Sequence, residues 1–512
     1  MNPLPALTET REGVGPIQSQ PGWLGASSPK NLLILQLARL GDLVQTWPLL
    51  TRLRQAYPGA RLTLLTDHRL LPLQAAGPKV EEVLGFDFLR LGALTARDWP
   101  GAYRLVAELL KDLQARDFDL MFNLNFSRLS LLLTHLLGVQ AKGYLPAAGG
   151  REFSREPWLA WIYSLVHARQ FNRFHLTDVF RHLAPEPAWA PPGPRLAAIP
   201  RREPVIALQL ATRHQRRTWP LAHFTRLAEH LVSRLGARVL LLGTASERGL
   251  GEKLRAALAP ALREGVVNLQ GATGLAELAG QLQQAHLLVS GDTGTLHLAA
   301  ALGVPTAALF LGPALCFETG PYGSGHYVLQ AEPPCHPCTE AASPCPPEGP
   351  ICLEMLPPQT VARFIAVWLE TGTAPGNLPL PSGSRIYRSG QDDFGVRYQY
   401  LGEEPPRFVD LVGRAYRRAG AWLAAPSPKP PPPNPYEEGD KCPSGDLPRL
   451  EVLLAVLNRG AQVPPELPQV TEALRPLLAF QDEMQRQGQQ ELFFGVKEVF
   501  TAQLENCLSV SR

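Results

Sequence analysis

The feature that most constrains the fold of this chain is an alternation of short apolar runs with longer helix-like stretches. An apolar run over 31–37 precedes a helical stretch over 43–57, and a second run follows at 61–66. Two more runs, at 83–86 and 120–123, enclose another helix-like stretch. Short apolar strands that alternate with helices predict βαβ units and a parallel sheet, here in a first domain over residues 30–183.

The same alternation returns after an interruption. Residues 184–204 are rich in proline and lack periodicity, which favours an interdomain linker. Apolar runs and helical stretches then alternate again, and they predict a second doubly wound domain over 205–372. Two such domains would hold a ligand in the cleft between them, at the carboxyl ends of the strands.

The two ends of the chain differ from these domains. Residues 1–29 are expected to be a flexible leader, and they lack the apolar core of a signal peptide. Residues 373–512 form an extension in which 425–436 holds seven prolines and is expected to be extended. Helical patterns at 447–458 and 470–487 predict that this extension is small and mainly helical.

Composition excludes several classes of protein. The 512 residues carry a formal net charge of only +3, too little to indicate a nucleic-acid partner. The longest uncharged stretch, 293–317, is broken by Gly303-Val304-Pro305 and by Gly312-Pro313, so we expect a buried helix and strand there instead of a membrane span. Seven cysteines in so long a chain do not form a secreted disulfide scaffold. We therefore expect a cytoplasmic protein.

The first motif is Gly41-Asp42, between an apolar run and a helix. Gly41 allows a tight turn, and Asp42 is placed at the rim of the first sheet. Asp42 is either an ordinary helix cap or a general base that removes a proton from an attacking hydroxyl.

The second motif is the segment 291–297, where the run 287–290 leads into a helix. Small residues at 291, 293 and 294 leave backbone N–H groups uncovered at the start of this helix, which suits a diphosphate. Asp292 is a poor neighbour for phosphate, so we expect it to cap the helix or to meet a sugar hydroxyl or the base. His297 lies in the first turn and either reaches the cleft or is buried in the core. No Gly-Lys-Ser/Thr follows, so this is not a Walker motif.

Three segments together resemble glycosyltransferase family 9, which contains the ADP-heptose:lipopolysaccharide heptosyltransferases. They are 35–42 with Thr46 and Pro48, then 289–305, then Gly320-Pro-Tyr-Gly323. The resemblance covers residues 30 to about 370. It implies a GT-B fold of two Rossmann-like domains that face a cleft. It also implies an inverting transfer that requires no metal, and ADP-heptose as the usual donor.

The resemblance assigns roles to seven residues. Asp42 takes the position of the catalytic base. The donor-binding block falls on Asp292, Thr293, Gly294 and His297. Arg217 stands where the family has a Lys that contacts donor phosphate, and Glu247 stands where a Glu meets the nucleoside. The expected acceptor is a lipid-anchored glycan at the inner face of the inner membrane. The alternatives are a nucleotide-sugar-binding or scaffold protein that transfers nothing, and a transferase for a different nucleotide sugar or a protein acceptor.

Four of the seven cysteines lie within eighteen residues: Cys335, Cys338, Cys345 and Cys352. The surrounding Pro, Ser and Gly predict a loop able to wrap an ion. Four thiolates would hold structural zinc, and an iron–sulfur cluster or paired disulfides are the alternatives. In none of these cases are the cysteines expected to be the catalytic centre.

An apolar stripe at helical spacing runs through Trp158, Trp161, Ile162, Leu165 and Val166. Such a stripe is usually core, and the alternative is a surface that meets a lipid-anchored acceptor.

Asp117-Phe118-Asp119 imitates the Asp-x-Asp metal site of other glycosyltransferases. It directly precedes an apolar run, so capping and turn formation explain it better than a metal.

Overall fold

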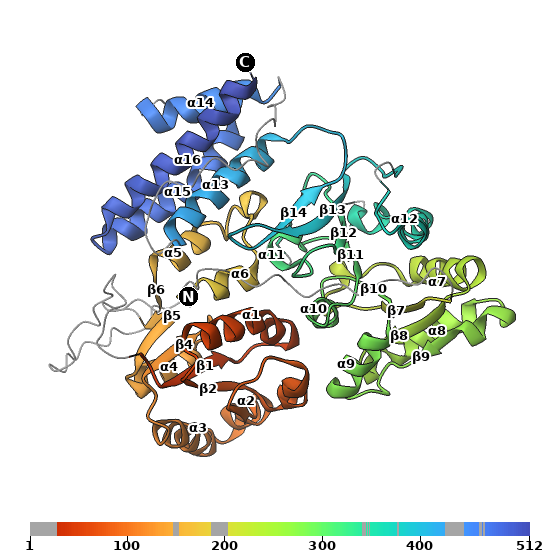
Figure 1. Cartoon of the computed structure of the whole chain (residues 1–512), viewed down its shortest axis with the longest axis horizontal. Coiled ribbons are helices and arrows are strands. Elements are labelled where there is room, and N and C mark those ends of the chain that lie inside the picture. Colours follow the sequence, from red (N-terminus) through yellow and green to blue (C-terminus); the bar gives the residue numbers. More distant parts are fainter. Residues whose placement is uncertain are drawn as a thin grey trace.

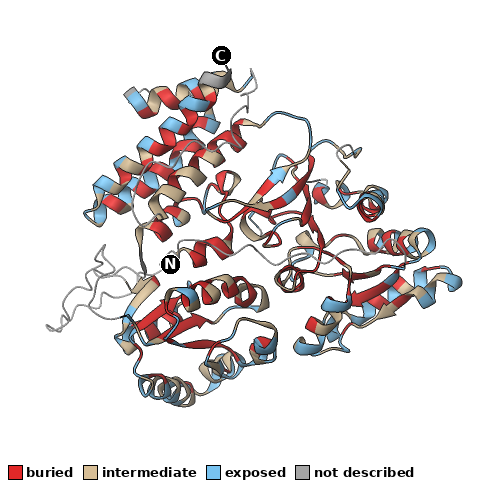
Figure 2. Cartoon of the chain, in the orientation of Figure 1, coloured by how far each residue is buried: buried red, intermediate tan, exposed pale blue. Residues whose placement is uncertain are grey.

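The computed structural model contains two α/β domains and a lobe of helices (Figure 1). It describes residues 28–146, 153–185, 203–339, 345, 347, 349–375, 378–424, 445–459, 463 and 466–511. Most of the expected leader, most of the linker 184–204 and all of the proline-rich segment 425–436 lie outside the described residues. Figure 2 shows buried residues along both sheets and on the inner faces of the lobe helices.

The first domain is built on a six-stranded sheet in the order β3-β2-β1-β4-β5-β6. Its strands are β1 (Asn31–Gln36), β2 (Arg61–Asp67), β3 (Glu82–Phe86), β4 (Leu120–Asn123), β5 (Gln140–Pro146) and β6 (Phe153–Arg155). Its helices are α1 (Leu40–Ala56), η1 (His68–Ala76), α2 (Phe88–Arg97), α3 (Trp99–Gln114) and α4 (Arg128–Leu137). All neighbouring strands run parallel except β5 and β6. The strand order reverses between β1 and β4, which is the topological switch point where ligands bind in such sheets.

The second domain has an eight-stranded sheet in the order β14-β13-β12-β11-β10-β7-β8-β9. Its parallel strands are β7 (Val205–Gln209), β8 (Arg238–Leu242), β9 (Val266–Asn268), β10 (Leu287–Ser290), β11 (Thr306–Phe310) and β12 (Tyr327–Ala331). Its helices are η3 (Gln215–Arg217), α7 (Leu221–Leu235), η4 (Ala245–Glu247), α8 (Arg248–Ala257), η5 (Pro260–Gly265), α9 (Leu275–Gln284), α10 (Gly294–Ala301), α11 (Cys316–Thr319), η6 (Ile351–Glu354) and α12 (Pro358–Thr371). The six parallel strands follow the Rossmann order, with a switch point between β7 and β10. The predicted α/β class with two doubly wound domains is confirmed.

The uncharged stretch 293–317 forms α10, β11 and the start of α11, with β11 wholly buried. Gly303, at a φ of +76°, turns the chain between α10 and β11. In the part of the chain that the structure describes, no helix is long and apolar enough to cross a membrane. The expectation of a buried helix and strand is therefore confirmed.

The second sheet continues beyond residue 372, where the sequence predicted the start of a mainly helical extension. Strands β13 (Ser384–Gln391) and β14 (Val396–Tyr400) form an antiparallel hairpin, and β13 pairs with β12. Both strands contain β-branched and aromatic residues such as Ile386, Tyr387 and Val396, which favour strand. The hairpin is thus part of the second domain's sheet, and the helical part of the extension begins after it.

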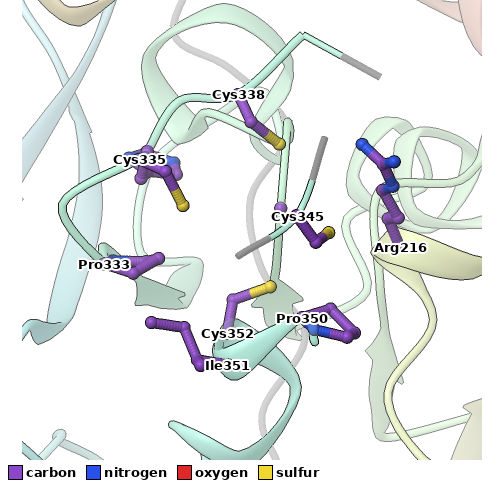
Figure 3. Close-up of a pocket in the computed structure, with 10 residues that line it drawn as sticks. Arg216, Pro333, Cys335, Cys338, Cys345, Pro350, Ile351 and Cys352 are labelled. Carbon is purple, nitrogen blue, oxygen red and sulfur yellow. The ribbon is translucent and has the colours of Figure 1, made fainter. Parts of the chain in front are cut away.

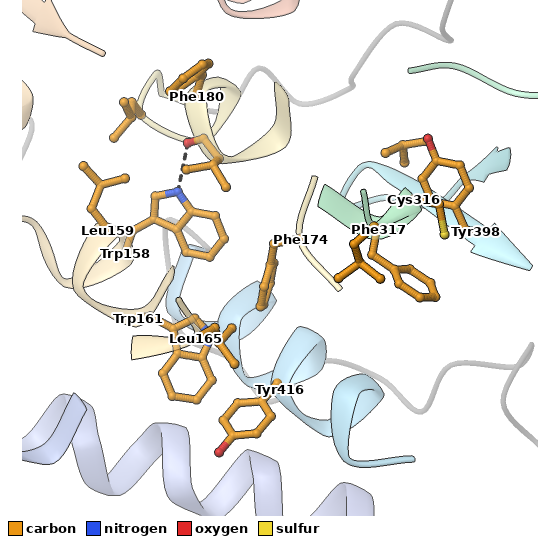
Figure 4. Packing of buried hydrophobic residues seen from close by; sticks show 14 of the residues in the cluster. Trp158, Leu159, Trp161, Leu165, Phe174, Phe180, Cys316, Phe317, Tyr398 and Tyr416 are labelled. Atoms are coloured by element: carbon orange, nitrogen blue, oxygen red, sulfur yellow. Dashed lines mark hydrogen bonds between the residues drawn. The ribbon is translucent and has the colours of Figure 1, made fainter. Parts of the chain in front are cut away.

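The helical lobe consists of α13 (Phe408–Ala424), α14 (Leu447–Arg459), α15 (Pro468–Arg486) and α16 (Gln490–Ser511). It packs on the segment after β6, which contains α5 (Pro157–Ser164), η2 (Arg169–Phe171) and α6 (Leu176–Arg181). Trp158 lies edge-on to Phe174, with ring centroids 5.5 Å apart, and its Nε1 donates to the carbonyl of Val179 (Figure 4).

Trp161 joins this segment to the lobe. It is fully buried, and its ring centroid lies 5.3 Å from that of Tyr416 on α13 and 5.1 Å from that of Phe480 on α15. Leu165 is also buried, whereas Val166 is 45% exposed. The predicted core role of the aromatic stripe is therefore confirmed, and its partner is the C-terminal lobe.

The Asp117-Phe118-Asp119 segment has a structural role, as the sequence indicated. The Oδ2 atom of Asp119 accepts hydrogen bonds from the backbone N–H groups of Lys30 and Asn31, at 2.6 and 2.8 Å. Asp119 therefore fixes the start of β1.

We predict that Trp161→Ala destabilises the protein because it removes a buried indole from between two helices. Replacement of a buried Trp by Ala costs about 3–5 kcal/mol in the free energy of unfolding. Chemical denaturation measures this loss. The matched control is Trp99→Ala, since the Trp99 side chain is 71% exposed and its removal should change stability by less than about 0.5 kcal/mol. Equal stabilities of the two variants would contradict the packing described here.

Candidate functional site

The two sequence motifs meet where the N-termini of α1 and α10 touch. Each helix follows a central strand at the switch point of its sheet, α1 after β1 and α10 after β10. A methyl group at Gly41 would lie 2.8 Å from Cδ2 of His297. A methyl group at Gly294 would lie 2.8 Å from Cγ of Leu40. The absence of a side chain at both positions allows this approach, which brings Asp42 to the donor-binding block that the sequence singled out.

Asp42 lies in the first turn of α1 and is half-buried. Its Oδ2 atom accepts a hydrogen bond of 3.1 Å from the backbone N–H of Arg39, so this oxygen caps the helix. The backbone carbonyl of Asp42 accepts from the hydroxyl of Thr46, which in turn accepts from Gln36 Nε2 at 3.0 Å. The cap occupies Oδ2 and orients the Asp42 side chain. The other oxygen of the carboxylate keeps the capacity to accept a proton from a substrate.

Asp292 does not cap α10, although the sequence offered this as one of its roles. Thr293 is the cap, because its hydroxyl accepts from the N–H of Leu296 at 3.2 Å. The Asp292 carboxylate instead accepts a 2.5 Å hydrogen bond from Nη1 of Arg217, and its Oδ1 lies 3.7 Å from Nε2 of His297. Thr293 was the better cap because its hydroxyl sits one residue before the first helical position.

The electrostatics of this cluster keep Asp292 charged. Burial by itself raises the pKa of Asp292, but its interactions with His297, Arg217 and Thr319 outweigh burial and hold the pKa below its ordinary value. Arg217 therefore neutralises a buried carboxylate. A guanidinium has five N–H donors, so the same Arg217 has further capacity for an anion.

His297 is buried, with 6% of its surface exposed. Its Nδ1 atom has no hydrogen-bond partner within the described part of the chain. Buried polar atoms are normally hydrogen-bonded, so this nitrogen is a candidate contact for a ligand or an ordered water.

Glu247 lies in the same domain, just after the carboxyl end of β8. Its Oε2 atom accepts from the N–H of Thr244 and from Nε2 of Gln209, both at 3.1 Å. The Oε1 atom of Gln209 accepts from the hydroxyl of Thr295 on α10 at 3.1 Å. A chain of hydrogen bonds therefore connects the Glu247 region to the Asp292 block.

Gln209 was missed by sequence reasoning, although a signal for it exists. It is the polar last residue of an otherwise apolar strand, and the carboxyl ends of parallel strands are where such sheets place functional side chains.

Arg169 was also missed, and it links the segment after β6 to the second domain. Its guanidinium donates to both carboxylate oxygens of Glu318 on α11, with the shortest contact at 2.6 Å. It also donates to the carbonyl oxygens of Pro313 and Cys338. A bidentate pair of this kind carries geometric specificity, but nothing in the sequence around Arg169 identifies its distant partner.

The four clustered cysteines surround one small cavity of about 20 Å³, lined also by Arg216 and His336 (Figure 3). All four are free thiols. Burial, and then the neighbouring Cys335 and Cys345, raise the pKa of Cys338, while Arg216 opposes this. Among the residues that the structure describes, no group of three or more His, Cys, Asp or Glu is arranged as a set of metal ligands.

Comparisons with known proteins identify relatives of the chain. The model of glycosyltransferase family 9 (heptosyltransferase) matches residues 106–347. Lipopolysaccharide heptosyltransferase 1 of Pseudomonas aeruginosa is 29% identical over 363 residues, which cover 66% of this chain and 98% of that relative. Lipooligosaccharide heptosyltransferase 2 of Haemophilus influenzae is 40% identical over 112 residues, which cover 22% of this chain and 32% of that relative.

Solved structures of similar proteins include ADP-heptose lipopolysaccharide heptosyltransferase II of E. coli. It is 20% identical, with a TM-score of 0.49, and the match covers 67% of this chain and 99% of that chain. E. coli heptosyltransferase WaaC with ADP is 22% identical, with a TM-score of 0.49, and the match covers 65% of this chain and 98% of that chain.

Two Rossmann-type domains whose switch-point helices meet at an Asp–Arg–His cluster, together with the family match and the sequence relatives, define a glycosyltransferase of the GT-B class. The family model and these sequence relatives show that the chain is similar to members of glycosyltransferase family 9.

We predict that Gly41→Ala lowers glycosyl transfer at least tenfold without unfolding the protein. The added methyl group would lie too close to the His297 ring, so this ring or the N-terminus of α10 must shift. The control is Gly280→Ala in α9, where nothing lies within 4 Å of the new methyl group. Steady-state kinetics and thermal melts of both variants measure the effect. Unchanged transfer by Gly41→Ala would show that close contact of the two helices is not required.

Proposed function

We propose that this glycosyltransferase transfers heptose from ADP-heptose to the lipopolysaccharide core or a related cell-surface glycan, with inversion at the anomeric carbon. The observation that supports the proposal is the contact between α1 and α10, because Gly41, the neighbour of Asp42, lies against His297 of the Asp292–Arg217–His297 cluster. The relatives named as lipopolysaccharide and lipooligosaccharide heptosyltransferases support the choice of sugar and acceptor. The reaction would then take place in the cytoplasm, with a lipid-anchored acceptor at the inner membrane face.

Asp42 is assigned the role of general base. Its carboxylate removes the proton from the acceptor hydroxyl as that oxygen attacks the anomeric carbon. The bond from this carbon to the diphosphate breaks on the opposite side, and the configuration at the anomeric carbon is inverted. The hydrogen bond from the N–H of Arg39 to Oδ2 holds the carboxylate in place, so that little motion is needed at the moment of transfer.

The donor diphosphate is assigned to the N-terminus of α10. Backbone N–H groups near Thr293 and Gly294, with Arg217, would stabilise the negative charge that grows on the leaving ADP. Asp292 is buried against Arg217 and is therefore a positioning residue for that guanidinium. His297 would contact the donor through Nδ1, and Glu247 would meet the nucleoside at the carboxyl end of β8.

We predict that Asp42→Asn folds normally and loses transfer by a factor of about 10² to 10⁴, since an amide cannot accept the proton. Transfer of labelled sugar from ADP-heptose to extracted lipopolysaccharide acceptor measures the loss. Asp482→Asn, at an exposed position on α15, is the matched control and should keep full activity. If Asp42→Asn turned over like the control, Asp42 would not be the base. If the native chain transferred nothing while still binding ADP-heptose, a non-catalytic binding protein would replace this proposal.

We also propose that the four clustered cysteines bind one metal ion with a structural role, zinc before iron. The support is the shared cavity of Cys335, Cys338, Cys345 and Cys352, and the mutual charge effects of their thiols. A cation would relieve the repulsion between thiolates. Four thiolates leave no open position for substrate, so transfer itself would not depend on the metal.

Metal content tests this second proposal. Elemental analysis of anaerobically purified protein should find about one equivalent of zinc or iron per chain. Cys338→Ser together with Cys345→Ser should abolish it and lower the melting temperature. Cys507→Ala, which lies in α16 far along the chain, should keep the metal. Metal-free native protein of unchanged stability would contradict the proposal.

A further inference from the structure

A cavity of about 320 Å³ lies between the β13–β14 hairpin and α13. This volume is at the lower end of the range for small-molecule sites. The hairpin and α13 lie beyond residues 106–347, the part that the family model matches. The proposed donor chemistry makes no use of this cavity.

The lining of the cavity carries an excess of positive charge. Five arginines line it: Arg173, Arg385, Arg397, Arg414 and Arg417. Three carboxylates line it, so two positive charges are in excess: Asp392, Glu404 and Asp410. In a concave surface such an excess attracts anions.

The carboxylates hold three of these arginines in fixed positions. Asp410 accepts from Arg173 at 2.9 Å, and it is also paired with Arg385 at 3.6 Å. Asp392 accepts from Arg417 at 2.7 and 2.9 Å. These three guanidinium groups are therefore ordered before a ligand binds.

Aromatic rings form another part of the wall: Phe317, Tyr387, Tyr398 and Tyr400. The guanidinium of Arg385 stacks 4.3 Å from the ring centroid of Tyr400, and that of Arg173 lies 4.0 Å from the ring centroid of Phe317. The hydroxyl of Tyr398 donates to the carbonyl of Pro321 at 2.9 Å, which fixes this ring. Flat apolar surfaces beside charged hydrogen-bond donors suit a ligand with both an apolar face and an anionic group.

The cavity is separate from the donor site but adjacent to it. Phe317 lies on α11 and lines the cavity, whereas Thr319, the last residue of the same short helix, interacts with Asp292. One helix of the second domain thus stands between the two sites.

We propose that this cavity binds an acidic sugar unit through its phosphate or carboxylate group. Arg397 from β14 and Arg414 from α13 supply the N–H donors for the anion, and the aromatic rings contact the faces of the sugar. Phosphate and carboxylate groups match the planar fork of an arginine side chain. The proposal does not depend on the identity of the transferred sugar.

Calorimetric titration of the full chain tests the proposal with three probes: glucose 6-phosphate, glucose and inorganic phosphate. Glucose 6-phosphate should bind more tightly than either of the others, because it alone engages both the arginines and the rings. Arg397→Gln and Arg414→Gln should each weaken it roughly tenfold or more. The matched control is Arg90→Gln, at an exposed position on α2, which should leave binding unchanged.

A second variant distinguishes loss of binding from unfolding caused by the removal of an arginine. Gln399→Glu adds a negative charge at an exposed position of the cavity wall and removes no arginine. It should weaken glucose 6-phosphate and leave the circular dichroism spectrum unchanged. Arg217→Gln, in the donor site, should not affect this binding.

Three results would overturn the proposal. The first is binding of glucose 6-phosphate that Arg217→Gln abolishes and the cavity variants leave intact, because the anion would then occupy the donor site. The second is equal affinity for inorganic phosphate and glucose 6-phosphate, because the sugar would then contribute nothing to binding. The third is the absence of binding by any of the three probes.

Discussion

The contact between the N-termini of α1 and α10 is the constraint on which the proposed chemistry depends. It joins two sheets that have no strand in common, and at this contact Gly41 packs against the ring of His297 and Gly294 packs against the side chain of Leu40. A Cβ atom at either glycine would lie 2.8 Å from a carbon of that neighbouring side chain, so the side chain or its helix would have to shift. The spacing between Asp42 and the 291–297 block is therefore sensitive to packing at the two glycines.

Around this contact, charged groups fix the orientation of the parts. Arg217 neutralises Asp292 within the second domain, and Arg169 holds Glu318 on the neighbouring α11. Both carboxylates lie in the second domain, whereas Arg169 comes from the segment that follows the first sheet. Charged pairs with restricted exposure are costly to separate, so the Arg169–Glu318 pair favours one arrangement of the two halves, whereas the Arg217–Asp292 pair orders the second domain alone.

The sequence predicted the sheets well because each strand is a local apolar run bounded by turn residues. Asp42 and the 291–297 block were proposed as site residues for the same reason: they follow such runs, and their spacing is local. The cap of α10 was assigned ambiguously, because Asp292 and Thr293 are both good cap residues and only the backbone geometry decides between them. The links from Arg169 to Glu318 and from Gln209 to Thr295 join residues far apart in the chain, and no local pattern encodes them. The hairpin β13–β14 was missed because helical patterns dominate the rest of the extension.

The packing of Trp161 against α13 and α15 has a consequence for synthesis of the protein. The ribosome synthesises the N-terminal half of the chain first, and domains generally fold as they emerge from the ribosome. The rings of Tyr416 and Phe480 follow Trp161 by more than 250 residues. Throughout that interval the indole of the nascent chain lacks these two ring partners. The packing around Trp161 is therefore completed only after α13 and α15 have been synthesised.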